Sequence, residues 1–207
     1  MDKIKTAVMV SGGGTNLQAI IDAVAAEKIK SASIEVVISS NASAYALQRA
    51  QNAGIKTAVV EKKQCDGAED FERRILGELT SRDIQLIVLA GFMSILSEKF
   101  TALYPGRIIN VHPSLIPAFC GKGCYGIKVH EAALRRGVKV SGATVHFVNE
   151  IPDGGEIIEQ KAVRVLPNDT PERLQQRVMR RAEWIILPRA VEQVAAHLLQ
   201  CKTQGDK

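Results

Sequence analysis

Aromatic residues are scarce in this chain of 207 residues: one Trp, three Tyr and five Phe make up 4% of it. So few flat side chains leave little surface on which single-stranded bases could stack. No apolar run reaches the roughly 18 residues that a membrane-spanning helix needs. The opening residues 1–5 also lack the apolar stretch and cleavage site of a signal peptide. We therefore expect a cytoplasmic protein that binds neither membrane nor nucleic acid.

Cysteine is sparse too, and four cysteines in a chain of cytosolic character are expected to be free thiols. Cys120 and Cys124 have the spacing of metal ligands, and His112 and His130 lie on either side of them. Two thiols and two imidazoles could bind zinc in a tetrahedral site. Because the four residues fall on different predicted elements, we expect no metal.

Neither sign of charge dominates: 27 Lys and Arg residues face 22 Asp and Glu residues, for a formal net charge of +5. This mildly basic balance suits an anionic small substrate. The 46% hydrophobic and 24% charged residues are typical of a globular protein and exclude a disordered or coiled-coil chain. We expect one domain over residues 1–207, since domains commonly run to about 100–200 residues.

The first half of the chain alternates strand-like and helix-like segments. The strand candidates are short apolar runs rich in β-branched residues, and the helix candidates repeat apolar residues every three or four positions. This alternation predicts a parallel sheet covered by helices on both faces. Strands are expected at 4–10, 34–38, 57–60 and 84–90, and helices at 15–27, 44–53 and 69–80.

The second half of the chain does not continue this regular alternation of strands and helices. A short strand is predicted at 107–111 and a helix at 127–136, followed by two long strands at 139–148 and 156–165. The loop 149–155 between the last two is short enough for a hairpin, so these strands are expected to run antiparallel. The predicted fold class is therefore α/β: a Rossmann-like open sheet, mostly parallel, with antiparallel strands in the C-terminal half and helices on both faces.

The chain ends in a long predicted helix. Thr170 is a good N-cap, and Pro171 suits the first helical position because its missing N–H costs nothing there. Pro188 is expected to kink or split this helix. Four arginines spaced three and four apart form one basic face, which is usually just solvated: Arg173, Arg177, Arg180 and Arg181.

A glycine-rich segment, residues 11–16 (SGGGTN), joins the first strand to the first helix. Glycines allow a tight turn, and the start of a helix offers free N–H groups and a positive dipole end. The segment lacks the full spacing of a P-loop or a dinucleotide fingerprint. A site for a single phosphate and a tight turn without a ligand are equally good interpretations.

Asn110 and His112 lie two residues apart at the carboxyl end of a predicted strand, so their side chains share one side. Open α/β sheets bind ligands at such strand ends. An amide and an imidazolium can both donate to a developing oxyanion. The alternative is a capping Asn with a hydrogen-bonded structural His.

Asp153 falls in the segment 151–155 (IPDGG), which has the composition of an ordinary turn. A functional Asp there would act as a base or raise the pKa of a neighbouring His through its charge. His146 could support such a pair, although a lone His in a strand is more often simply packed.

Taken together, these segments resemble the phosphoribosylglycinamide formyltransferases of the folate-dependent formyltransferase family. The likeness spans nearly the whole chain. The pattern Asn-x-His-Pro-Ser-Leu with a downstream Asp-Gly-Gly is specific to formyl transferases and hydrolases that use folate. The matching segments are 11–18 (SGGGTNLQ), 89–93 (LAGFM), 110–117 (NVHPSLIP), 145–148 (VHFV) and 153–155 (DGG).

The resemblance implies transfer of a formyl group from 10-formyltetrahydrofolate, as co-substrate, to the amine of glycinamide ribonucleotide in purine biosynthesis. Asn110 and His112 would stabilise the tetrahedral oxyanion, and His112 would also donate a proton. Asp153 would keep His112 protonated and, directly or through water, take the proton of the amine.

The resemblance also implies that the two halves of the chain have different roles. The half around residues 1–100 would bind phosphate, and the half around 101–207 would bind folate and carry the catalytic groups. We expect a monomer or a homodimer. The implied substrate-binding residues are Gly13, Gly14, Thr15, Asn16, Arg180 and Glu183. The implied folate-binding residues are Met93, Ser94, Ile95, Leu96, Asn110, Asn149, Glu150, Ile151, Pro152 and Asp153.

Two other functions need to be distinguished. A formyltetrahydrofolate hydrolase would share the catalytic residues but would usually carry an extra N-terminal domain, which we do not expect because the first strand begins near residue 4. A non-catalytic module that binds anions or nucleic acid through the basic final helix would show salt-sensitive binding without formyl transfer.

Overall fold

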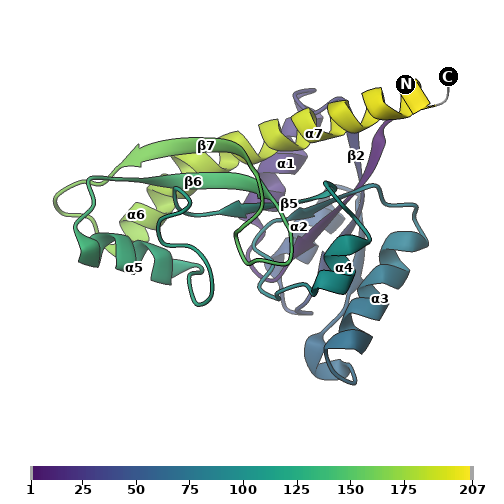
Figure 1. The fold of residues 1–207 in the computed structure, drawn as a ribbon, viewed down its shortest axis with the longest axis horizontal. Coiled ribbons are helices and arrows are strands. Elements are labelled where there is room, and N and C mark those ends of the chain that lie inside the picture. The colour runs from purple at the N-terminus through teal and green to yellow at the C-terminus, as the bar shows by residue number, and fades with distance from the viewer. Residues whose placement is uncertain (1, 206–207) are drawn as a thin grey trace.

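The computed structural model describes residues 2–205, which form one seven-stranded sheet with helices on both sides (Figure 1). The strand order is β3-β2-β1-β4-β5-β6-β7. The first five strands are parallel, whereas β6 and β7 are antiparallel to their neighbours. The predicted fold class is confirmed. The strands are β1 Ile4–Val10, β2 Ala32–Ser39, β3 Lys56–Val59, β4 Leu86–Leu89, β5 Ile108–His112, β6 Val140–Phe147 and β7 Ile157–Arg164.

The predicted helices form within a few residues of their expected ends. Two short elements, η1 and α4, were not predicted, because five or fewer residues show no periodicity. Among residues 2–205, no helix combines the length and the apolar character needed to cross a membrane. The helical elements are α1 Thr15–Ala25, α2 Tyr45–Asn52, η1 Lys62–Gln64, α3 Ala68–Thr80, α4 Glu98–Ala102, α5 Ile127–Arg136, α6 Pro171–Val178, η2 Met179–Glu183 and α7 Trp184–Gly205.

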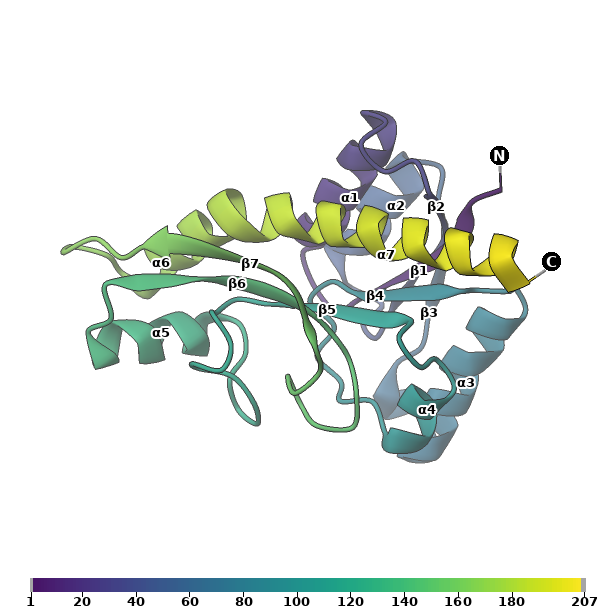
Figure 2. The same cartoon turned by 45° about the horizontal axis from the view of Figure 1, so that its top comes forward.

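The core has two parts because successive side chains of a strand point to opposite faces of the sheet. In β4, Leu86 and Val88 join the core shared with α1 and α7, whereas Ile87 and Leu89 join the core shared with α3 and α4. Figure 2 shows this division, with α7 running along one side of the sheet and α3 and α4 on the other. All four side chains are almost fully buried. Burial on both faces explains why this strand reads as a continuous apolar run.

The last helical region begins as predicted and continues differently. Thr170 Oγ1 accepts a hydrogen bond from the N–H of Arg173 at 3.3 Å, and Pro171 is the first residue of α6. Pro188 was expected to kink or split the helix, and the split does not occur, because α7 continues through it. The carbonyl that the proline ring would approach belongs to Trp184, whose ψ of −8° differs from the roughly −42° of a regular helix. The irregularity lies one turn earlier, in the π-helical η2.

Three loops meet at one edge of the sheet. Parallel strands end at the same edge, so β1, β4 and β5 bring the segments after Val10, after Leu89 and around His112 together. The chain order reverses at β1, which lies between β2 and β4. Open α/β sheets bind ligands at such a switch point.

Candidate active site

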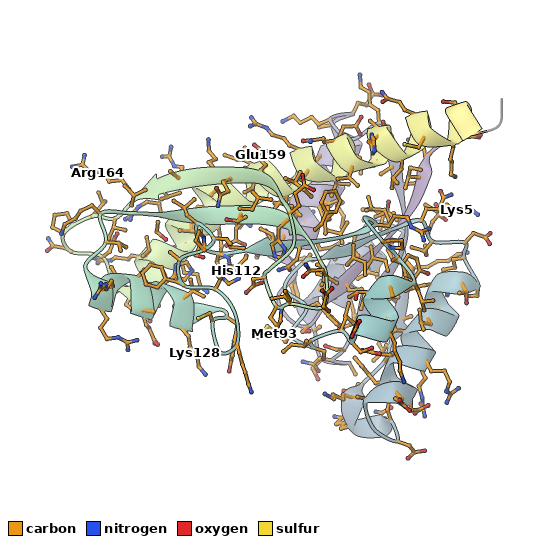
Figure 3. All side chains as sticks on the ribbon, in the orientation of Figure 1. Lys5, Met93, His112, Lys128, Glu159 and Arg164 are labelled. Atoms are coloured by element: carbon orange, nitrogen blue, oxygen red, sulfur yellow. The ribbon has the colours of Figure 1, made fainter. Side chains whose placement is uncertain are left out.

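A cavity of about 820 Å³ opens at this edge. Its walls come from the glycine loop after β1, the segment after β4, the end of β5, the loops around 121–126 and 148–153, and η2. In Figure 3, His112 lies near the middle of the molecule, above Met93. Every predicted site residue lines this cavity except Arg180, which is exposed to solvent and does not contribute to the wall.

His112 is buried, with 4% of its surface exposed, and both of its ring nitrogens face acceptors. Nε2–H donates to the carbonyl of Phe119 at 2.9 Å. Nδ1 lies 3.5 Å from Oδ2 of Asp153, which also accepts a hydrogen bond from the N–H of Gly121 at 2.8 Å. A neutral imidazole carries one N–H and satisfies one acceptor, whereas an imidazolium satisfies both.

Asn110 and His146 form the neighbouring pair. They lie directly opposite each other on β5 and β6, because the antiparallel register aligns them. Asn110 Nδ2 donates to His146 Nε2 at 3.2 Å, and His146 Nδ1–H donates to the carbonyl of Phe147 at 2.7 Å. His146 therefore holds one amide hydrogen of Asn110 and leaves the other free. His146 Nε2 also lies 3.5 Å from Asp153 Oδ1, so the same histidine lies beside both Asn110 and Asp153.

Burial and nearby charges shift the pKa values of His112 and Asp153 in opposite directions. Burial lowers the pKa of His112, while the Asp153 carboxylate and the Phe119 carbonyl raise it, and the net pKa is below its ordinary value. Burial raises the pKa of Asp153, but the contact with His146, the Gly121 N–H and the charge of His112 together lower it below the usual range. Asp153 thus raises the pKa of His112, which is the predicted direction. In the protein without substrate, burial lowers this pKa by more than Asp153 raises it.

The turn that presents Asp153 is strained. The N–H of Gly154 donates to the carbonyl of Ile151 at 2.9 Å, and Asp153 has a positive φ of 57°. Such a φ is costly for a residue other than glycine, and strain of this kind is concentrated at functional sites. Gly155 follows where a Cβ would lie 1.8 Å from the carbonyl oxygen of Phe147, so only glycine fits.

The glycine loop forms a cradle at the start of α1. Gly14 is the N-cap residue with φ of 71°, and a Cβ there would lie 2.6 Å from the Cβ of Ala46. Among residues 2–205, no side chain caps α1, so the first N–H groups of the helix are left for a ligand. Together with the positive end of the helix dipole, these N–H groups suit an anion.

Glu183 completes the cradle from the other end of the chain. It is 6% exposed, and its Oε2 accepts a hydrogen bond from Asn16 Nδ2 at 2.6 Å. Burial raises the pKa of Glu183 to about 7, and the Asn16 contact lowers it only in part. The π turn of η2 adds one residue to a helical turn and sets which side chain faces the cavity; such turns are frequent at functional sites.

Gln175, Met179 and His130 also line the cavity, although sequence reasoning assigned none of them to it. Gln175 and Met179 precede Glu183 at steps of four residues. His130, at the start of α5, is fully buried, and neither ring nitrogen has a hydrogen-bond partner among residues 2–205. Burial and the charge of His112 lower the pKa of His130 to about 4. The four-residue steps from Gln175 through Met179 to Glu183 were a usable signal, whereas the place of His130 was not visible in the sequence.

Apolar side chains rim the cavity mouth. Met93 is 54%, Ile95 70% and Ile151 57% exposed, which is unusual for large apolar residues. Such a rim suits a ligand with a flat apolar body. Across residues 2–205, no three side chains of His, Cys, Asp or Glu are grouped as metal ligands, and the four cysteines are free thiols.

The geometry of the cavity defines a class of chemistry. A free amide hydrogen, an imidazole and a carboxylate beside an anion cradle suit acyl transfer, in which the carbonyl oxygen becomes negatively charged as a nucleophile attacks. The model of the protein family Formyl transferase matches residues 4–191 of this chain. The chain therefore belongs to the formyl transferase family.

Individual relatives agree with this assignment. The chain is 43% identical over 188 residues to phosphoribosylglycinamide formyltransferase of Haemophilus influenzae, covering 91% of this chain and 85% of the relative. It is 41% identical to the trifunctional purine biosynthetic protein adenosine-3 of Gallus gallus, covering 99% of this chain but spanning only about a fifth (20%) of that relative's length. The crystal structure of glycinamide ribonucleotide transformylase 1 from Symbiobacterium toebii superposes with a TM-score of 0.88 at 38% identity, covering 94% of this chain and 89% of that one.

Proposed function

We propose that this chain transfers the formyl group of 10-formyltetrahydrofolate to the amine of glycinamide ribonucleotide, a step of purine biosynthesis. One observation carries the proposal: Asn110, His112 and Asp153 converge in a single cavity whose other end is an anion cradle. The named relatives support the choice of substrates.

The reaction begins with attack of the substrate amine on the formyl carbon. The new C–N bond converts the formyl oxygen into an oxyanion. The free amide hydrogen of Asn110 and an N–H of His112 donate to it. In the resting protein Nε2–H of His112 is bound to Phe119, so the oxyanion replaces that carbonyl as the acceptor.

Proton transfer completes the reaction. Asp153, whose pKa is low, is ionised at neutral pH and takes a proton from the attacking nitrogen, directly or through water. The oxyanion then collapses, the bond to the folate nitrogen breaks, and that nitrogen leaves with a proton from His112. Return of the proton from Asp153 to His112 restores the starting state. The negative charge of the oxyanion favours the imidazolium form of His112 that burial alone disfavours.

The two ends of the cavity would each bind a different substrate. The cradle of Gly13, Gly14, Thr15 and Asn16 would bind the phosphate of the ribonucleotide, and Glu183 would bind its ribose or amine end. The apolar rim at 93–96 and the backbone of 149–153 would bind the pterin of the folate.

A single assay tests the proposal. The protein is mixed with 10-formyltetrahydrofolate, with and without glycinamide ribonucleotide, and loss of the formyl group is followed. We expect consumption only when the ribonucleotide is present. Equal consumption without it would identify a hydrolase, and salt-sensitive RNA binding with no consumption would identify a binding module.

A further inference from the structure

Helix α2 lies behind the phosphate cradle and contacts it through its backbone and one charged side chain. The N–H of Ala46 donates to the carbonyl of Gly12 at 3.1 Å, and Arg49 Nε donates to the carbonyl of Gly13 at 2.8 Å. Gly12 and Gly13 line the catalytic cavity, whereas Arg49 lies outside it, on the wall of a groove between α1 and α7. Arg49 therefore reaches the cradle from the side opposite the substrate.

Peptide geometry links these two contacts to the substrate side. The C=O and N–H of one trans peptide point in opposite directions. Holding the Gly12 carbonyl from behind thus turns the N–H of Gly13 toward the cavity, and holding the Gly13 carbonyl does the same for Gly14. Within residues 2–205, neither of these two N–H groups donates to another protein group, so both remain available to a phosphate.

The guanidinium of Arg49 is itself held in place. It lies 5.0 Å from the centre of the Tyr45 ring, and its Nη1 donates to Gln18 Oε1 at 3.1 Å. Gln18 is bound in turn to Asp22, one turn further along α1, at 2.9 Å. In the described part of the chain no carboxylate lies within ion-pair distance of Arg49, so its positive charge is not neutralised beside the cradle.

We propose that Arg49 is a positioning residue for the substrate phosphate: it orients the N–H of Gly14 from behind and adds positive charge to the cradle without touching the ligand. This inference rests on the proposed function, because it assigns the cradle to the phosphate of the formyl acceptor. It places a determinant of substrate affinity outside the catalytic cavity.

The test compares two acceptors, glycinamide ribonucleotide and the ribonucleoside that lacks its phosphate. For Arg49→Met we expect the KM for the ribonucleotide to rise about tenfold, since one charged hydrogen bond and its field are lost. The kcat and the KM for the formyl-folate should stay within about twofold. With the ribonucleoside, Arg49→Met and the unaltered protein should perform equally. Arg49→Lys keeps the charge and should recover most of the loss.

A matched control is Arg189→Met, which removes an exposed arginine from the opposite wall of the same groove and should leave all constants unchanged. An unchanged ribonucleotide KM in Arg49→Met would overturn the inference. So would an equal loss with the ribonucleoside, or no recovery in Arg49→Lys, because either result indicates general damage to α2.

A binding measurement separates this inference from the proposed function. Calorimetry with ribose 5-phosphate needs no turnover, and Arg49→Met should bind it about tenfold more weakly than the Arg189→Met control. If no formyl transfer occurs but this difference remains, the proposed function fails and the positioning role stands. Equal affinity in the two variants removes the role of Arg49 even if transfer is confirmed.

Discussion

His112 and Asn110 lie at the centre of the proposed chemistry, and neighbouring groups hold both side chains in place. The Phe119 carbonyl and Asp153 face the two nitrogens of His112, and His146 holds one hydrogen of the Asn110 amide. This arrangement fixes both donors before the substrate arrives. Donors preorganised toward a developing charge contribute most of their stabilisation in the transition state.

Replacing either donor with alanine tests their role. For His112→Ala or Asn110→Ala we expect kcat to fall by about 10²–10³-fold, since one oxyanion donor typically contributes about 2.7–4 kcal/mol. Binding of ribose 5-phosphate should survive, because the cradle is formed by other residues. A near-normal rate in either variant would remove that residue from the mechanism.

Glu183 makes a second prediction at the residue scale, concerning stability against pH. Its pKa is about 7 in the folded protein and 4.5 as the reference for the unfolded chain. Between these values the folded state holds a proton that the unfolded state has lost, so stability falls as pH rises from 4.5 through 7. A shift of this size corresponds to about 3 kcal/mol above pH 7.

Glu183→Gln removes that penalty while keeping an oxygen for Asn16. We expect its free energy of unfolding in urea to exceed that of the unaltered protein at pH 8, and the difference to disappear near pH 4.5. Its affinity for the ribonucleotide should fall, as is common when a functional site is relieved of a buried charge. Parallel pH profiles for the two proteins would contradict the raised pKa.

Among individual residues, those in continuous motifs were predictable. Asn110 and His112 are two apart on one strand, so period-two alternation places them together. Their distance to Asp153 could not be predicted, because 40 residues and a change of strand direction separate His112 from Asp153. His130 was weighed as a metal ligand, and its burial without partners follows from how α5 packs, which no local pattern encodes.

At the scale of elements, the turn around Asp153 depends on its glycines. Gly155→Ala would place a Cβ 1.8 Å from the Phe147 carbonyl oxygen, so the turn must shift. Since Asp153 is two residues away, we expect kcat to fall at least roughly tenfold and stability to fall by roughly 2 kcal/mol. Steady-state rates and urea unfolding measure the two effects.

The matched control is Gly77→Ala in α3, where a Cβ meets no atom within 4 Å. An exposed helical glycine gives up backbone entropy on folding, so this change should stabilise the protein by roughly 0.5–1 kcal/mol with an unaltered rate. If Gly155→Ala behaved like Gly77→Ala, the tight packing of the turn would play no part in placing Asp153.

The end of the chain shows where element prediction failed. Proline inside a helix normally predicts a break, yet α7 continues past Pro188. The cost of proline depends on the carbonyl four residues earlier, and the π turn before Trp184 reorients that carbonyl. The period of a π turn is not visible in a sequence read at 3.6 residues per turn.

At the scale of the whole molecule, α7 fastens the last part of the chain to the first. Glu192 accepts hydrogen bonds from Lys30 N at 2.8 Å, and from Ser31 N and Ser31 Oγ at 2.9 Å each. Figures 1 and 2 both show α7 passing beside β2, which begins just after these residues. We expect Glu192→Ala to lower stability by about 1–3 kcal/mol, because three bonds to a charged acceptor are lost.

Thermal unfolding measures this loss, and kcat should not change, since Glu192 does not line the cavity. Glu192→Gln keeps one oxygen acceptor and should lose less. A melting temperature equal to that of the unaltered protein would show that α7 is held by its apolar face alone.

The local pattern of residues was enough to predict the alternation of strands and helices, the antiparallel pair and the glycine loop, because periodicity, turn residues and caps act over a few neighbours. Contact between Asn16 and Glu183, 167 positions apart, arose only when the sheet ordered its strands and the final helix packed back on it. Burial followed from the same packing, and burial is what gives Glu183 and His112 their altered acidities. Short motifs therefore determine which chemical groups the site contains, whereas the packing of the whole chain determines the distances between them and their charge states.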